Sequence, residues 1–207
     1  MSAQQSVNPP LLIYLHGFLS SSQSFKCRSM CGWLARAHSD IAFAAPQLSP
    51  HPGKAMAVLT RLIDDRFAAD ADSRVGLLGS SMGGFFATVL AERYRLPAVL
   101  VNPAVRPARF MPAYLGQTLI PYSGEARDYR LTEADVDTMQ QLEDELPQPL
   151  TSRYWLLAQR GDETLDCREA EVFYRGERQT VEDGGNHSFA GYERYRQPII
   201  DFLFKQQ

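Results

Sequence analysis

The chain has 207 residues, of which 44% are hydrophobic and 22% are charged, and its formal net charge at pH 7 is −3. This length fits one domain, which buries about 70% of the surface that its unfolded chain exposes. The composition is typical of a soluble globular domain. The small negative charge gives no reason to expect nucleic acid or an anionic membrane as a partner.

Short apolar runs alternate with longer segments of helical periodicity along the chain. Six strands are expected at residues 11–16, 41–46, 74–79, 98–101, 154–158 and 179–182. Helices are expected at residues 25–37, 55–69, 84–94, around 133–146, 168–174 and 192–204. Such alternation predicts a parallel sheet with helices on both faces and right-handed crossovers.

The alternation is interrupted between Asn102 and Arg153, where the sequence has no strand signal. This stretch contains several prolines and tyrosines and only one helical pattern. Long insertions at the carboxyl edge of a parallel sheet are where lids and binding loops lie. We therefore predict a small cap segment, residues 103–152, over a functional site.

The first residues of the chain and its cysteines indicate the cellular compartment of the protein. The first residues are polar and lack basic side chains, and the apolar run at residues 11–15 is too short for a membrane span or a signal-peptide core. The three cysteines, Cys27, Cys31 and Cys167, are odd in number and widely separated, which is typical neither of a disulfide framework nor of a zinc site. We therefore predict a cytoplasmic protein without membrane insertion and without a bound metal.

The third expected strand is followed by Gly79-Ser80-Ser81-Met82-Gly83, a Gly-x-Ser-x-Gly pattern directly before a helix. In a strand–turn–helix context this pattern presents a serine nucleophile on a tight, strained turn. The glycines leave room that a Cβ atom would fill. The following helix has the positive end of its dipole at the serine, where it favours a developing negative charge. The pattern predicts Ser81 as a nucleophile.

A serine hydroxyl needs a base, and the base needs an orienting acid; the chain order expected here is Ser, acid, His. His187, in a glycine-rich loop before the last helix, is the one histidine of four that follows Ser81. The loop after the fifth strand offers Asp162, Glu163 and Asp166 as the acid. We favour Asp162 because it comes first after the strand. Asp166 is expected to cap the next helix and Glu163 to be solvated or salt-bridged.

An oxyanion hole needs two backbone N–H donors aimed at the developing negative charge. Met82, the residue after the nucleophile, is expected to supply one donor. The second is expected from Phe18, in the loop after the first strand, where Gly17 allows close approach to the substrate. His16 is predicted to shape this loop and not to act as the base. Phe18, Leu19 and Met82 are also expected to present apolar side chains to the acyl group.

Taken together, these motifs resemble the α/β-hydrolase superfamily and, more narrowly, the small YqiA-like esterases. The motifs are His16-Gly17-Phe18, residues 79–83, Asn102-Pro103-Ala104, Gly161-Asp162-Glu163 and Gly185-Asn186-His187. The resemblance runs from about residue 12 to residue 204 and includes segments without a catalytic duty, such as residues 100–107 and 114–117.

The resemblance implies a minimal α/β-hydrolase fold with a six-stranded parallel sheet of order 2-1-3-4-5-6. It also implies hydrolysis of carboxyl esters or thioesters without a cofactor. By motif position it places the nucleophile at Ser81, the acid at Asp162 and the base at His187. Residues 1–9 exceed what the family needs and are predicted to form a flexible tail before a single domain at residues 10–207.

The favoured hypothesis is a serine hydrolase that cleaves small-molecule esters or acyl thioesters through an acyl-enzyme. A small cap further predicts an open site that prefers short or unhindered acyl groups. A second hypothesis uses the same triad as a base for carbon–carbon cleavage or elimination. Four arginines around the cap would then hold a carboxylate or phosphate of the substrate: Arg106, Arg109, Arg127 and Arg130.

Against that use, the chain has 18 arginines and three lysines, so arginine is its ordinary surface cation. A third hypothesis is a non-catalytic ligand-binding or scaffold protein on a hydrolase fold. The presence of competent residue types at all three triad positions argues against it.

Overall fold

The computed structural model describes residues 8–122 and 129–205. Its six strands form one parallel sheet of order β2-β1-β3-β4-β5-β6, which confirms the predicted fold class and strand order. The strands are β1 (Leu11–Leu15), β2 (Ala42–Ala44), β3 (Val75–Ser80), β4 (Ala98–Val101), β5 (Tyr154–Gln159) and β6 (Arg178–Glu182).

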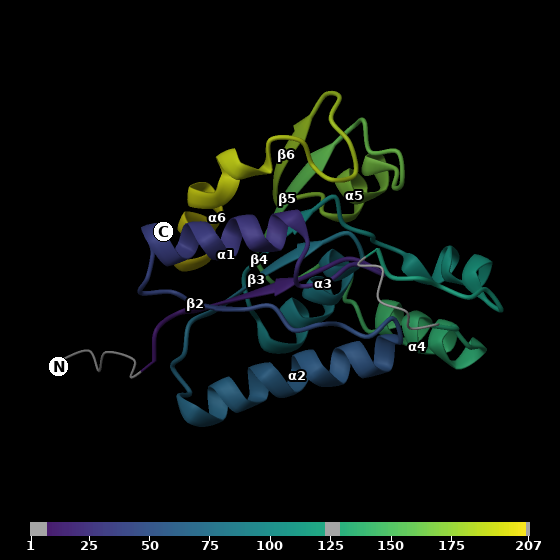
Figure 1. Cartoon of the computed structure of the whole chain (residues 1–207), viewed down its shortest axis with the longest axis horizontal. Coiled ribbons are helices and arrows are strands. Elements are labelled where there is room, and N and C mark those ends of the chain that lie inside the picture. Colours follow the sequence, from purple (N-terminus) through teal and green to yellow (C-terminus); the bar gives the residue numbers. More distant parts are fainter. Residues whose placement is uncertain (1–7, 123–128, 206–207) are drawn as a thin grey trace.

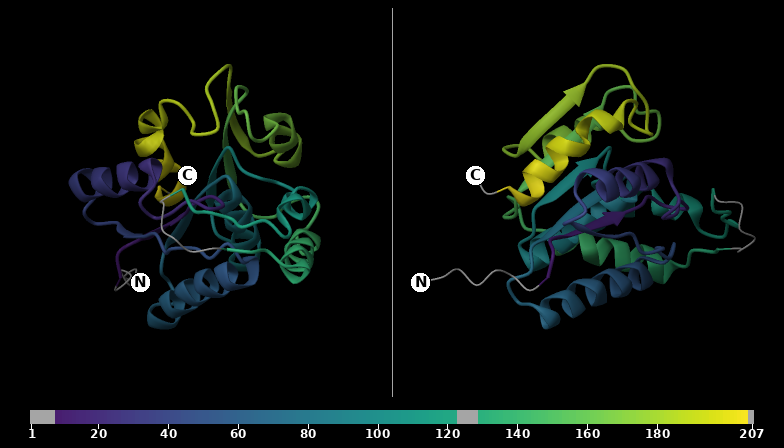
Figure 2. Two further views of the ribbon diagram at one scale, coloured as in Figure 1. Left: turned by 45° about the vertical axis from the view of Figure 1, so that its right-hand side comes forward. Right: turned by 60° about the vertical axis from the view of Figure 1, so that its left-hand side comes forward.

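Helices cover both faces of the sheet (Figure 1). Helices α1 (Phe25–Ala37) and α6 (Arg196–Phe204) pack on one face, and α2 (Pro52–Ala69) and α3 (Met82–Tyr94) pack on the other. The turned views show the same three layers, with α2 on the side away from α1 and α6 (Figure 2). The short helix α5 (Cys167–Phe173) lies between β5 and β6 in the chain and packs on the α2–α3 side.

Strand β1 shows how the sequence divides the core in two. Leu12 and Tyr14 pack with α1 and α6, whereas Leu11, Ile13 and Leu15 pack with α2 and α3. Successive side chains of a strand point to opposite faces, so a continuous apolar run is the pattern of a strand covered on both sides. All five side chains are buried, which makes β1 a central element of the fold.

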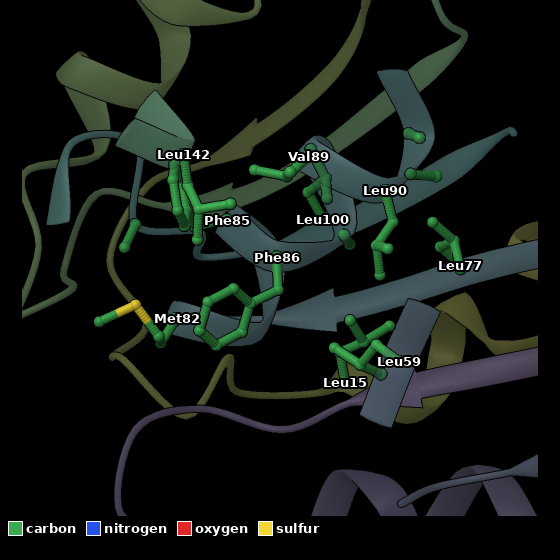
Figure 3. Packing of buried hydrophobic residues seen from close by; sticks show 14 of the residues in the cluster. Leu15, Leu59, Leu77, Met82, Phe85, Phe86, Val89, Leu90, Leu100 and Leu142 are labelled. Atoms are coloured by element: carbon green, nitrogen blue, oxygen red, sulfur yellow. The ribbon is translucent and has the colours of Figure 1, made fainter. Parts of the chain in front are cut away.

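The core on the α2–α3 side also anchors the cap segment (Figure 3). Leu142 of helix α4 (Glu133–Asp144) packs in the same apolar cluster as Phe85 of α3, and both side chains are buried. Next to them on α3, Met82 and Phe86 extend the cluster toward the site (Figure 3). The cap is therefore attached to the helix that follows the serine turn.

The cap segment is less irregular than the sequence pattern indicates. It contains two 3₁₀ helices, η1 (Pro107–Arg109) and η2 (Met111–Tyr114), before α4. Two isolated β-bridges, Leu115 with Leu131 and Leu119 with Tyr129, close its middle part. A hydrogen bond of 3.0 Å from His51 Nδ1 to the Asp135 carboxylate ties α4 to the start of α2.

Several element boundaries differ from the sequence prediction by one to three residues, and the start of α3 is the one that bears on the site. Helix α3 starts at Met82 and not at residue 84, so its first turn contains Gly83 and Gly84, which are poor helix formers. A Cβ on Gly83 would lie 2.1 Å from the Leu15 carbonyl oxygen, so packing excludes a larger residue there. The last helical segment divides into the 3₁₀ helix η3 (Tyr192–Tyr195) and α6.

Candidate active site

Ser81 occupies a strained turn between β3 and α3. Its φ of 56° and ψ of −125° lie outside the regions that side chains favour. A Cβ on Gly79 would lie 2.3 Å from the Gly83 carbonyl oxygen, so the turn closes only with glycine at that position. The Ser81 N–H donates to the Val101 carbonyl and its carbonyl accepts from the Ala104 N–H, both at 3.1 Å. These bonds fix the serine at the carboxyl end of the sheet.

Ser81, His187 and Asp162 form one continuous hydrogen-bonded chain. His187 Nε2 lies 3.1 Å from Ser81 Oγ. On the other side of the ring, Nδ1 lies 2.9 Å and 2.8 Å from the two Asp162 carboxylate oxygens. The Asp162 side chain is 2% exposed and the His187 side chain 24% exposed, so the contact is shielded from water at the acid and open at the base. The structure thus brings together the three residues that the sequence singled out.

The environment of Asp162 keeps its carboxyl group ionised. Burial alone would raise the pKa of this group, but hydrogen bonds from His187 and from the backbone N–H groups of Leu165 and Thr164 lower the pKa below its ordinary value. The ionised carboxylate accepts a hydrogen bond from His187 Nδ1–H. In neutral His187 this leaves Nε2 as an acceptor facing the Ser81 hydroxyl.

The two other carboxylates of the loop after β5 have different contacts. Asp166 Oδ1 accepts from the Arg168 N–H at 2.9 Å and caps α5, as the sequence predicted. Glu163 Oε2 accepts from the backbone N–H of His187 at 2.9 Å. Glu163 is exposed, in keeping with the expectation of a solvated side chain, and in addition it binds the loop that carries His187.

Two buried amide side chains that sequence reasoning missed also hold the His187 loop. Asn102 Nδ2 donates to the carbonyl oxygens of Asn186 at 3.0 Å and His187 at 3.1 Å, and its Oδ1 accepts from the Gln159 N–H at 2.9 Å. Gln159 Oε1 accepts from the N–H groups of Asn186 at 3.1 Å and Ala190 at 2.8 Å. Asn102 has a φ of 42°. An Asn directly after a buried strand, in a motif of the family, was the available signal.

His16 shapes the loop after β1, as expected. Its Nε2 accepts from the Leu48 N–H at 2.9 Å, and its Nδ1 lies 2.9 Å from the Gly17 carbonyl oxygen. Burial lowers the pKa of His16, although the bond to Gly17 opposes this, so a neutral ring donates from Nδ1. The Gly17 carbonyl also accepts from the Ser20 N–H. Because a trans peptide is planar, the Phe18 N–H of the same peptide unit points the opposite way.

The N–H groups of Phe18 and Met82 lie beside the serine and are unused as donors within the part of the chain that the structure describes. Met82 is the first residue of α3, whose N-terminal amides lack partners within the helix. A Cβ on Gly17 would lie 3.1 Å from Ser81 Cβ, so the loop that carries Phe18 lies directly against the serine.

Two adjoining hollows open beside Ser81. The first, of about 420 Å³, contains Ser81 and His187 and is called here the serine pocket. The second, of about 350 Å³, is called the side pocket. Both are lined by Phe18 and Met82, and the side pocket also by Leu19. The three predicted substrate-contacting residues therefore lie on the walls of the site.

The cap contributes residues to both pockets but not its arginines. Phe110 and Tyr114 line the serine pocket, and Met111 and Met139 line the side pocket. No arginine lines either hollow in the part of the chain that the structure describes. Three arginines border a separate hollow of about 370 Å³: Arg106, Arg109 and Arg168.

Of the other two cap arginines, Arg127 lies outside the described residues, and so do residues 1–7 of the tail predicted at residues 1–9. Arg130 is exposed. Within the described ranges, no group of three or more His, Cys, Asp or Glu side chains is arranged to hold a metal ion. In the same ranges no helix combines the length and apolar character needed to cross a membrane.

This sheet order, with a serine turn after β3 and an Asp and a His in the loops after β5 and β6, is that of the α/β-hydrolase fold. Solved structures agree in fold. Est1E from Butyrivibrio proteoclasticus matches with a TM-score of 0.74 and 16% identity, over 96% of this chain and 88% of that one. The mouse alpha/beta hydrolase domain-containing protein 10 matches with a TM-score of 0.71 and 16% identity, over 97% of this chain and 93% of that one.

A Pyrococcus furiosus esterase, Pf2001, matches with a TM-score of 0.63 and 16% identity, over 95% of this chain and 81% of that one. At the level of sequence, the family described as "Uncharacterised protein family (UPF0227)" matches residues 11–204. The chain therefore belongs to this family, the YqiA-like family within the α/β-hydrolase superfamily.

Proposed function

We propose that this protein is a serine hydrolase that cleaves small carboxyl esters or acyl thioesters through an acyl-enzyme intermediate. The observation that carries the proposal is the continuous chain of hydrogen bonds from Asp162 through His187 to Ser81 Oγ, on a strained turn at the mouth of the serine pocket. The esterases among the solved structures of the same fold add support by analogy.

In the acylation step, Ser81 Oγ attacks the carbonyl carbon of the substrate while His187 Nε2 takes the hydroxyl proton. The carbonyl oxygen becomes an oxyanion and accepts hydrogen bonds from the N–H groups of Phe18 and Met82. The ionised Asp162 stabilises the imidazolium that forms. Collapse of the tetrahedral intermediate breaks the bond to the leaving oxygen or sulfur, which takes the proton from Nε2.

Deacylation repeats these steps with water as the nucleophile. His187 Nε2 accepts a proton from the water as the water oxygen attacks the acyl carbon. The second tetrahedral intermediate then releases the carboxylic acid, and Ser81 Oγ recovers its proton from Nε2. Asn102 and Gln159 act as positioning residues, since their amide groups fix the loop that carries His187. The imidazole ring is therefore held in the same place in both steps.

The test is covalent labelling with a fluorophosphonate, combined with hydrolysis of phenyl acetate and of a short acyl thioester. Ser81→Ala is expected to abolish labelling and to lower turnover by several orders of magnitude. Ser80→Ala is the matched control, because this neighbour ends β3 and has no bond to His187; it is expected to label normally. Labelling that survives Ser81→Ala and disappears in Ser80→Ala would overturn the assignment.

A further inference from the structure

Lys26 is a cation in an unfavourable place. It lies in the first turn of α1, a 13-residue helix with no acidic residue in that turn and no side-chain hydrogen bond at its N-cap. The positive end of the helix dipole repels a cation there. Burial also lowers the pKa of Lys26 to about 8, although the Asp162 carboxylate opposes this. Because neither effect stabilises the fold, the charge at this position requires a partner that compensates it.

Lys26 lines the serine pocket on the His187 side. Its Nζ donates to the Ser188 carbonyl oxygen at 3.0 Å, directly after His187 in the chain. An ammonium group has three donors, so two remain for other partners. Among the described residues that line the pocket there is no Asp, Glu or Arg, and Lys26 is the one lysine. The Asp162 carboxylate is occupied by His187 and two backbone N–H groups.

The proposed chemistry assigns this side of the pocket to the leaving group. His187 Nε2 must protonate the leaving oxygen or sulfur, so that atom lies within hydrogen-bond distance of Nε2. The carbonyl oxygen of the substrate is directed to the N–H groups of Phe18 and Met82. The rest of the leaving group then extends past His187 and Ser188 toward Lys26.

We propose that Lys26 and the N-terminus of α1 bind an anionic group, a carboxylate or a phosphate, carried by the alcohol part of the ester. This inference rests on the proposed hydrolase function and names its substrate class. The sequence analysis considered the cap arginines for binding a carboxylate or phosphate of the substrate. In this proposal Lys26 has that role, and it acts on the leaving group. The charge of the ammonium group gives preference for anionic over neutral leaving groups of the same shape.

Two acetyl esters that differ in one group test the proposal: 4-acetoxybenzoate and its neutral counterpart 4-acetoxybenzamide. Both form the same acyl-enzyme, so the ratio of their kcat/KM values isolates recognition of the leaving group. Lys26→Met is expected to lower this ratio about tenfold or more, the size expected for a hydrogen bond to a charged group. Lys26→Arg is expected to keep most of it. Lys54→Met, at an exposed position on α2, is the matched control and should leave it unchanged.

Further substrates separate the alternatives. With 4-acetoxyphenyl phosphate, a larger loss in Lys26→Met than with the benzoate identifies phosphate as the better anion. Monophenyl succinate and phenyl succinamate differ by a carboxylate on the acyl side. The ratio of their kcat/KM values should not depend on Lys26. An equal loss for benzoate and benzamide would show that Lys26 only tethers Ser188. That result, or a Lys26-dependent ratio for the succinyl pair alone, overturns the proposal.

The preference should also follow the charge of the lysine. The benzoate-to-benzamide ratio of the unmodified protein is expected to fall between pH 7 and pH 9, because Lys26 loses its proton through a pKa of about 8. In Lys26→Met the ratio should be flat. The other titratable groups that face this pocket are present in both proteins, so any contribution that they make to the ratio also appears in Lys26→Met and is separated by the comparison: His187 with its partner Asp162, and Tyr14, Tyr114 and Tyr122.

A binding measurement keeps the proposal separate from the proposed function. In Ser81→Ala, calorimetric titration with 4-hydroxybenzoate and 4-hydroxybenzamide measures recognition without turnover. Tighter binding of the benzoate that disappears on adding Lys26→Met supports the anion site even if no ester is hydrolysed. Equal binding of the two compounds overturns it, whether or not Ser81 is labelled by a fluorophosphonate.

Discussion

Asp162→Asn tests the hydrogen-bonded chain from Asp162 through His187 to Ser81, because the contacts of Asp162 predict which way the new amide group will face. Asp162 Oδ1 accepts from the backbone N–H groups of Thr164 at 2.8 Å and Leu165 at 2.9 Å. In the variant these two donors require the amide oxygen at the same position, so the NH₂ group faces His187. The NH₂ group then takes the position of Oδ2, 2.8 Å from Nδ1, and donates to it, which favours the ring proton on Nε2, where it blocks acceptance of the Ser81 proton.

The magnitudes separate chemistry from stability. Loss of the correct tautomer is expected to lower kcat by about 10⁴, or about 5.5 kcal/mol of transition-state stabilisation. The fold retains both backbone contacts, which change from charge-assisted to neutral hydrogen bonds at a cost of about 1–2 kcal/mol of unfolding free energy. Asp166→Ala removes the cap of α5 and is expected to cost about 1 kcal/mol of stability while most activity remains.

Both variants are to be measured for thermal unfolding and for hydrolysis of phenyl acetate. The expected result is a folded, nearly inactive Asp162→Asn and a slightly destabilised, active Asp166→Ala. A stably folded Asp166→Ala that is inactive, beside an Asp162→Asn with normal turnover, would refute the reasoning. Substantial turnover in Asp162→Glu would show in addition that His187 requires a carboxylate but not this exact side-chain length.

Three further predictions concern the surroundings of the triad. Asn102→Gly keeps the backbone at a φ of 42° but removes three hydrogen bonds, so kcat should fall by up to about 100-fold at similar KM; steady-state kinetics showing normal kcat would exclude a positioning role. Burial would raise the pKa of Glu182, but hydrogen bonds from Tyr195, Arg194 and Gln159 lower it to about 2. The stabilisation by this carboxylate is therefore present above pH 4.5 and lost toward pH 2, so the thermal midpoint of Glu182→Gln should lie below that of the unmodified protein at pH 7 and converge with it in acid. Finally, esters of graded acyl length should show the highest kcat/KM for short chains because the cap is small; a steady rise to long chains would contradict an open site.

The parts of the fold and site that the sequence predicts are those with a local signature. Parallel strands buried on both faces are continuous apolar runs, so the parallel sheet followed from β1, β3, β4 and β5, whereas its strand order followed from the family resemblance. The Gly-x-Ser-x-Gly pattern is a local signature as well, although the packing that requires Gly83 comes from the Leu15 carbonyl of the distant strand β1. The order of Ser81, Asp162 and His187 along the chain then pointed to three positions that the structure brings into contact.

The parts that were missed depend on contacts between distant segments. Asn102 binds Asn186 and His187, 84 and 85 residues further along the chain, and no periodicity records such a pairing. Lys26 lies on a helix whose bounds were predicted, yet the direction in which its first turn meets the pocket depends on how α1 packs on the sheet. In the cap, prolines and 3₁₀ turns replace the regular periods on which prediction relies.

The contacts of the His187 loop also explain how the triad can be held precisely beneath an irregular cap. His187 lies in a loop, but that loop is bound by Glu163 after β5, by Asn102 after β4 and by Gln159 at the end of β5. In contrast, no cap residue of the described ranges hydrogen-bonds to the side chains of the triad. The sheet ends therefore determine the geometry of the proposed triad, whereas Phe110 and Tyr114 of the cap only line the serine pocket. Substitutions in the cap should accordingly change which esters bind, with little effect on how fast a fluorophosphonate reacts with Ser81.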